Sequence, residues 1–81
     1  MRIQFLFHGV LIRLAGCETL SIECPANSTV EQALAQLATQ LPAMATELQR
    51  TACAQGDSLL SRSRNLTGDA EIALIPPVSG G

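Results

Sequence analysis

Apolar and polar residues alternate from the start of the chain, a pattern that predicts a β-strand over residues 2–8. Its odd positions share one apolar face, formed by Ile3, Phe5 and Phe7. A second alternation over residues 18–24 predicts another strand, which Pro25 ends. The apolar segment between them, residues 9–16, has a glycine at each end and is expected to be a turn. The two strands should therefore form an antiparallel hairpin with a long connection.

After Asn27 the apolar residues recur with the period of a helix. One helical face is formed by Val30, Leu34, Leu37, Ala38 and Leu41. Ser28, followed three residues later by Glu31, predicts a capping box at the start of this helix. Pro42 should end the helix, and a weaker helical turn is expected over residues 42–48.

The rest of the chain predicts short strands separated by turns. Strands are expected over residues 51–54, 58–61 and 71–75, with a polar loop over residues 62–66. The last strand has Ile72 and Leu74 on one face, with Ala73 and Ile75 on the other. This order of elements predicts an α+β fold, in which a mixed sheet of about four to five strands packs on one main helix.

Length and composition indicate one folded domain over residues 1–81. Apolar residues make up 47% of the chain and charged residues 15%, which excludes disorder as the main state. A domain of this size buries only about 60% of the surface that its unfolded chain exposes. Some of the apolar residues should therefore lie outside, so that the chain is either a poorly soluble monomer or keeps an apolar patch for a partner.

The charged residues exclude binding to a nucleic-acid backbone. The chain has five arginines, no lysine and a net charge of −2, so it lacks a basic stripe. Arg62 and Arg64 come closest to one, and we expect them in a solvated loop.

Conventional catalytic and metal-binding constellations are missing from the sequence. Cys17, Cys24 and Cys53 form no C-x-x-C pair, and His8 is the only histidine, so no metal site is expected. Free thiols favour a reducing compartment, which we expect to be the cytoplasm. No Ser-His-acid set or phosphate-binding glycine loop can be assembled, so we expect no active site in this domain alone.

Two features bear on membranes, and neither predicts an association. No apolar run approaches the 18 or so residues that a membrane-spanning helix needs. Residues 14–17 imitate a lipoprotein cleavage site, but Arg13 places a charge directly before it, where a signal peptide has none. We expect neither a signal peptide nor a lipid anchor.

The chain ends in Ile75-Pro76-Pro77-Val78-Ser79-Gly80-Gly81, which combines a stiff segment with a thin tip. The two prolines fix φ and extend the chain beyond the last strand, while the two glycines carry no side chain that would block a narrow channel. Residues 76–81 span at most about 20 Å, which is enough to place the terminal carboxyl group inside another protein's active site.

A terminal carboxylate is ionised at neutral pH and is a poor electrophile, so it must be activated before it can react. Adenylation by ATP would supply a leaving group. A sulfur nucleophile could then form a thiocarboxylate, or an amine could form an amide. The domain would in either case be a carried reagent, with catalysis supplied by its partners.

Three segments of the sequence resemble the small subunits of molybdopterin synthase, which are ubiquitin-like sulfur carriers related to the sulfur carrier of the thiamine pathway. The segments are residues 3–16, Ser28-Thr29-Val30-Glu31-Gln32-Ala33-Leu34, and residues 66–81 with their Pro-Pro-Val-Ser-Gly-Gly ending. The resemblance covers essentially the whole chain. It implies a ubiquitin-like β-grasp fold followed by a flexible C-terminal tail, residues 76–81.

The resemblance also implies the chemistry of the tail. An E1-like adenylyltransferase would use ATP to adenylate Gly81, and a sulfurtransferase or cysteine desulfurase would supply the sulfur of a covalent thiocarboxylate there. The tail would thread into the large subunit of molybdopterin synthase, where its sulfur builds the dithiolene of molybdopterin. The threading residues are Pro76, Pro77, Val78, Ser79 and Gly80. The chain would be a non-catalytic carrier subunit without a bound cofactor.

An apolar face of the sheet is the expected partner interface. The resemblance implies His8, Leu59 and Ile75 as interface positions, and strand alternation independently adds Leu6 and Ala73.

Three alternatives stay open for the function. The chain could be a sulfur carrier for thiamine, cysteine or a secondary metabolite; a ubiquitin-like modifier joined to target lysines; or an interaction module with an inert tail.

Overall fold

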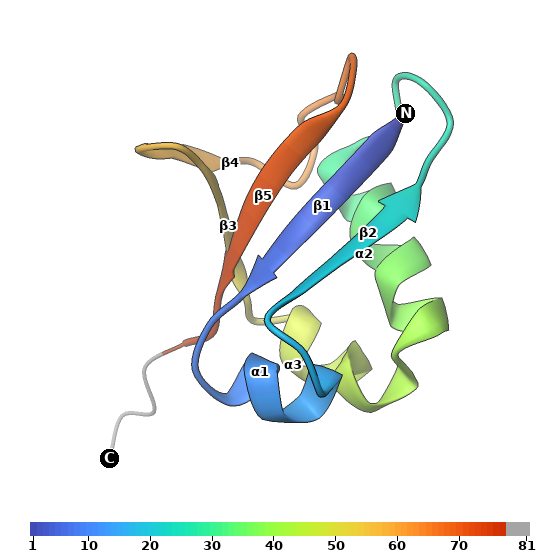
Figure 1. The fold of residues 1–81 in the computed structure, drawn as a ribbon. Coiled ribbons are helices and arrows are strands. Elements are labelled where there is room, and N and C mark those ends of the chain that lie inside the picture. The colour runs from blue at the N-terminus through green and yellow to red at the C-terminus, as the bar shows by residue number, and fades with distance from the viewer. Residues whose placement is uncertain (78–81) are drawn as a thin grey trace.

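A computed structural model describes residues 1–77 of the chain (Figure 1). Its strands are β1 (Arg2–Phe7), β2 (Thr19–Glu23), β3 (Ala52–Gln55), β4 (Ser58–Leu60) and β5 (Ala70–Ile75). Its helices are α1 (Val10–Ala15), α2 (Val30–Gln40), the 3-10 helix η1 (Pro42–Met44) and α3 (Ala45–Leu48). Within residues 1–77, no helix is both long enough and apolar enough to cross a membrane.

The strands of the described residues form one mixed sheet in the order β2-β1-β5-β3-β4. β1 runs parallel to β5, whereas the pairs β1–β2, β3–β5 and β3–β4 are antiparallel. The helices lie against one face of this sheet and around one of its ends, with α2 as the longest (Figure 1). The α+β architecture predicted from the sequence is therefore confirmed.

The core lies between the sheet and the helices. Alternate strand residues enter it, namely Ile3, Phe5, Phe7, Ile22, Cys53, Ile72 and Leu74, and α2 adds Val30, Ala33, Leu34 and Leu37. Two apolar residues of the predicted elements, Leu20 in the strand over residues 18–24 and Leu41 on the helical face, are only half-buried. Leu20 belongs to an edge strand, and Leu41 caps a helix where the chain turns away.

The prediction of a turn over residues 9–16 is wrong, because this segment contains α1. Leu11 in its first turn is completely buried in the core, so burial of this apolar segment stabilises a helix. The glycines at each end allow the entry and the exit: Gly9 has φ +57° and Gly16 has φ +74°. Both values lie in a region that side chains disfavour, which is why glycine serves at these two positions.

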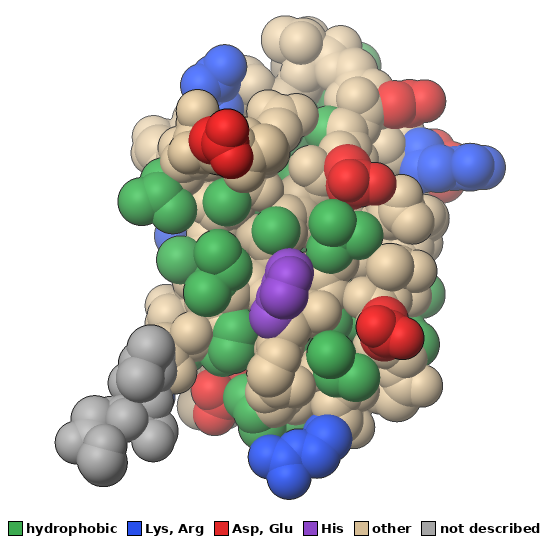
Figure 2. All heavy atoms as spheres, turned by 60° about the vertical axis from the view of Figure 1, so that its left-hand side comes forward, with side chains coloured by type: hydrophobic (Ala, Val, Ile, Leu, Met, Phe, Trp, Pro, Cys, Tyr) green, Lys and Arg blue, Asp and Glu red, His purple; other side chains and the backbone are tan. Residues whose placement is uncertain are grey.

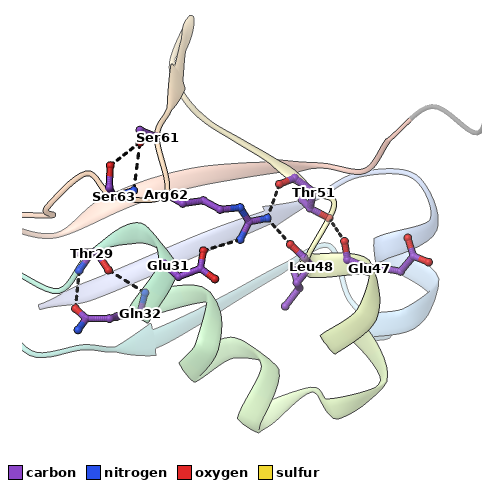
Figure 3. Close-up of polar contacts among 9 residues, drawn as sticks. All are labelled: Thr29, Glu31, Gln32, Glu47, Leu48, Thr51, Ser61, Arg62 and Ser63. Carbon is purple, nitrogen blue, oxygen red and sulfur yellow. Dashed lines mark hydrogen bonds and ion pairs between the residues drawn. The ribbon is translucent and has the colours of Figure 1, made fainter.

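The start of α2 also differs from the prediction, by one residue. Thr29 rather than Ser28 is the N-cap: its hydroxyl accepts from the Gln32 backbone N–H at 3.1 Å, and the Gln32 side chain accepts from the Thr29 N–H at 2.8 Å (Figure 3). The Ser28 hydroxyl instead donates to the Pro25 carbonyl at 2.7 Å. The Ser28 side chain is therefore directed back towards Pro25, and the next residue pair, Thr29 and Gln32, forms the capping box.

Arg62, expected in a solvated loop, points inward and joins three segments (Figure 3). Its guanidinium lies 3.1 Å from the Glu31 carboxylate and donates to the carbonyls of Leu48 and Thr51, the latter at 2.9 Å. Carbonyls at the end of a helix have no partner within the helix, and Arg62 satisfies that of Leu48 at the end of α3. Through Arg62, the loop over residues 62–66 is therefore bonded to α2, to α3 and to the residue just before β3. Leu66 of the same loop is buried.

The corrected cap predicts that Thr29→Ala lowers the free energy of unfolding by about 1 kcal/mol, because it leaves an N–H of the first helical turn without its acceptor. Thr39→Ala is the matched control on the same helix. The Thr39 hydroxyl is exposed and bonds only the Ala35 carbonyl, at 3.1 Å, so replacement by a better helix former should leave stability unchanged or raise it slightly. Urea denaturation of both variants measures the difference, and equal losses would contradict the assignment.

Candidate functional site

The sheet face opposite the helices, here called the outer face, carries a row of apolar side chains across four neighbouring strands. The strand register pairs Leu6 with Ala73, Ala73 with Ala54, and Ala54 with Leu59. Residues directly opposite one another in a sheet place their side chains on the same face, so these four form a continuous outer row. Its neighbours in β1, Phe5 and Phe7, point into the core.

The outer row and the adjacent Ile75 leave apolar surface open to solvent. Leu59 is 76% exposed and Ile75 is 43% exposed, which makes them the exposed large hydrophobic residues of the described chain. Leu6 and Ala73 are half-buried, and Ala54 is only 8% exposed although it lies outside the core cluster. Figure 2 shows hydrophobic side chains gathered around the histidine, with acidic side chains spaced about them.

The outer face is divided into a polar half and an apolar half. Towards the start of β1 and β5 the register places Gln4 beside Glu71 and Ser21. Towards the end of β5 the outward residues are Ala73 and Ile75, and Pro76 follows directly. The apolar half therefore adjoins the place where the tail leaves the domain.

The residues after β5 continue past the end of the sheet. Ile75 is the last residue of β5 in register with β3, where it pairs with Ala52. Pro76 and Pro77 lack an N–H that could extend the ladder, so the pairing ends here. Both prolines are half-buried, and we call this pair the tail root.

The loop after β1 lies next to the tail root. His8 is exposed, and its Nδ1 lies 3.3 Å from the Leu74 carbonyl oxygen of β5. Gly9 follows with φ +57° and ψ −133°, and a Cβ placed on it would lie 3.3 Å from Cγ of Pro76. The His8–Gly9 loop therefore lies beside the tail root, with too little space between them for a side chain on Gly9.

The thiols of Cys24 and Cys53 are buried and poorly suited to act as nucleophiles. Burial raises the pKa of the Cys53 thiol, an effect that Arg62 partly offsets. Burial is also the main cause that raises the pKa of the Cys24 thiol. Both thiols are accordingly protonated at neutral pH, whereas the nucleophile would be the thiolate. Among residues 1–77, no group of three His, Cys, Asp or Glu side chains is arranged to hold a metal ion.

The structure places all five predicted interface residues on the outer face or at its edge. Leu6 and Ala73 are cross-strand neighbours, and Leu59 ends the same row. His8 and Ile75 lie at the tail end of the face. Their role in binding a partner stays a prediction. Of the predicted tail residues, Pro76 and Pro77 form the tail root, and Val78, Ser79, Gly80 and Gly81 lie outside the described residues.

The sequence did not predict that two further residues belong to this region. Ala54 lies between Ala73 and Leu59 in the outer row. The expected alternation of the strand over residues 51–54 could have placed its side chain on the sheet face away from the buried Cys53. Gly9 had no comparable signal, because its contact with Pro76 joins positions that lie far apart in the sequence.

Comparison with known proteins agrees with this architecture. Residues 5–81 match the model of the ThiS family, and no curated protein matches the chain. Among solved structures, the chain is similar to SAMP1 from Haloferax volcanii, at 22% identity and a TM-score of 0.88 with all of both chains covered. It is similar to a complex of subunits 1 and 2 of the molybdopterin-converting factor from Helicobacter pylori 26695, at 23% identity and a TM-score of 0.68, again with full coverage.

A third similar structure is a ubiquitin from Caldiarchaeum subterraneum, at 18% identity and a TM-score of 0.65, with 100% of this chain and 98% of that chain covered. At such identities the likeness shows the fold, which is therefore the ubiquitin-like β-grasp. This confirms the fold expected from the sequence.

The burial of the thiols predicts an order of reactivity. Under native conditions iodoacetamide should modify the half-buried Cys17 at least about tenfold faster than Cys24 or Cys53, because modification requires an accessible thiolate. Peptide mapping by mass spectrometry after short exposures measures the three rates. In denaturant the three cysteines should react alike, and a native rate for Cys53 equal to that of Cys17 would contradict its burial.

Proposed function

Because the chain belongs to the ThiS family, we propose that it is a sulfur carrier of molybdenum cofactor biosynthesis, acting as the small subunit of a molybdopterin synthase. The observation that carries the proposal is the apolar half of the outer face, which lies directly beside the tail root. A partner that covers this face would receive the tail at the same edge. Docking and delivery of the terminus would then be one event.

The reactive group would be the carboxylate of Gly81. Its oxygen attacks the α-phosphate of ATP on an E1-like adenylyltransferase, pyrophosphate leaves, and an acyl adenylate forms. The outer sulfur of a persulfide on a sulfurtransferase or cysteine desulfurase then displaces AMP and forms an acyl disulfide. A thiol reductant cleaves its S–S bond, which releases the thiocarboxylate and leaves the donor sulfur in a disulfide with the reductant. The partners supply the catalytic groups, and this chain supplies the acyl group.

The large synthase subunit is the partner proposed for the outer face. In support, the similar Helicobacter pylori structure is a complex of subunits 1 and 2 of the molybdopterin-converting factor. Leu59 would contribute most to docking, because its side chain is 76% exposed and burying a leucine stabilises a complex by about 1.5–3 kcal/mol. Ala54 and Ala73 follow it in the outer row, and their small side chains leave room for a side chain of the partner.

A protein modifier is the second candidate. It would use the same adenylation but would transfer the terminus to a lysine amine. The observation in its favour is the similarity to SAMP1 of Haloferax volcanii, with a TM-score of 0.88. Lysates would then contain target lysines joined by an isopeptide bond to Gly81, and tryptic digestion would leave residues 65–81 of this chain on them, because Arg64 is its last arginine. A carrier for another sulfur pathway shares all of the chemistry up to the thiocarboxylate and differs only in the acceptor.

Incubation with ATP, a cognate E1-like enzyme and a sulfur donor should increase the intact mass of the protein by the difference between sulfur and oxygen. Deletion of Gly81 should abolish the gain, because the activated carboxyl group is displaced from the partner's active site. The circular dichroism spectrum of the deletion variant should match that of the wild type, which controls for folding. An unchanged mass with a competent enzyme would refute the carrier function.

Leu59→Asp should weaken binding to the large synthase subunit by about tenfold or more, because it places a charge in the apolar part of the interface. The free energy of unfolding should change by no more than about 0.5 kcal/mol, since the Leu59 side chain is exposed in the free protein. Gln36→Asp adds the same carboxylate to an exposed position of α2 and should leave the affinity unchanged. Isothermal titration calorimetry measures both affinities, and equal effects would rule out docking through the outer face.

A further inference from the structure

The chains of β1 and β5 separate at the edge of the sheet where the tail root begins. Their parallel pairing ends at Phe7 and Leu74. Beyond this pair, β5 continues through Ile75 to Pro76, whereas the chain after β1 turns at Gly9 into α1. Parallel strands end at the same edge of a sheet, so the loop after β1 lies next to the chain that leaves β5.

The turn at Gly9 brings its backbone against the proline ring of the tail root. A Cβ built on Gly9 would lie 3.3 Å from Pro76 Cγ, closer than nine in ten contacts of real Cβ atoms, so the proline ring would have to shift slightly. The φ of +57° with ψ of −133° is a conformation that only glycine adopts without strain. Glycine therefore permits both the turn and the close approach of Pro76.

The His8–Gly9 loop is held in place from the domain side. The His8 carbonyl accepts from the Leu11 N–H, and the Gly9 carbonyl accepts from the Ile12 N–H, each at 3.1 Å. Leu11 is completely buried in the core, which anchors the first turn of α1. On the other strand, the Leu74 carbonyl oxygen lies 3.3 Å from His8 Nδ1. A displacement of the loop would therefore be opposed by the core.

We propose that Gly9 is a positioning residue for the tail. Its contact with Pro76 sets the direction in which the chain leaves the domain, and hence the angle between the tail and the outer apolar face. This inference rests on the proposed function, in which one partner holds that face and receives the tail. The outer face would govern affinity, whereas Gly9 would govern how well the bound terminus meets the reacting groups.

Steady-state adenylation by the E1-like enzyme separates these two roles. Gly9→Ala should lower kcat about tenfold or more and change KM by less than about twofold, because a small misplacement of the reacting carboxylate slows the reaction without removing docking contacts. Gly16→Ala is the matched control: it also places a side chain at positive φ, at the other end of α1, but no atom lies within 4 Å of its Cβ. Both constants of this control should stay within about twofold of the wild type.

A second variant alters the same contact from the Pro76 side and introduces no strain into the backbone at Gly9. Pro76→Ala removes the Cγ that faces Gly9 and keeps the glycine, so it should lower kcat in the same way even if Gly9→Ala folds poorly. Circular dichroism at the assay temperature confirms that each variant is folded. Wild-type kcat in both contact variants, or an equal loss in Gly16→Ala, would overturn the proposal.

Nuclear magnetic resonance of the isolated protein tests the geometry without any partner. The wild type should show a nuclear Overhauser effect between the Gly9 α protons and the Pro76 ring. The Cα–Hα residual dipolar couplings of Pro76 and Pro77 should change in Gly9→Ala, while those of Ile72 and Leu74 stay as in the wild type. If the wild type is never adenylated but these signals behave as stated, the proposed function fails and the positioning contact stands. Absence of the Overhauser effect overturns the contact itself.

Discussion

The parallel pairing of β1 with β5 is the constraint on which the rest of the structure depends. It joins the first strand of the chain to the last over five residue pairs, from Ile3 and Ala70 to Phe7 and Leu74. A parallel pair cannot be closed by a tight turn, so the intervening chain must cross over, and α2 with its neighbours covers one face of the sheet on the way. The same pairing makes both strands end at one edge, where the His8–Gly9 loop meets Pro76.

The exposed site follows from the small size of the domain. A chain of 81 residues provides one main helix, and its apolar stripe covers only one face of the sheet. The opposite face stays open, so its apolar half, from Leu6 to Leu59, is available to another protein. In the proposed sulfur carrier, the outer face would recognise the partner and the terminus would react. The loop at Gly9 would set the angle between the tail and the outer face.

Local patterns predicted most of the fold because strands and the long helix repeat a simple period. The alternation of Ile3, Phe5 and Phe7 and the helical spacing after Asn27 are visible without any tertiary information. The errors arose where a residue makes a contact that its local sequence pattern does not indicate. The Ser28 hydroxyl donates to the Pro25 carbonyl while Thr29 caps the helix, and burial of Leu11 stabilises a helix where two glycines suggested a turn. Arg62 likewise points inward because carbonyls at the end of α3 and the start of β3 accept its hydrogen bonds.

The sequence by itself determined which strand faces are apolar and which residues form the tail, because side-chain alternation and the fixed φ of proline are local properties. It therefore identified Leu6, Ala73 and Ile75 as outward residues before any contact was known. Only the tertiary structure decided that these residues join Ala54 and Leu59 in one row, and that Gly9 lies against Pro76. Strand order and register bring together residues separated by most of the chain, and these follow from packing of the whole core rather than from any local pattern.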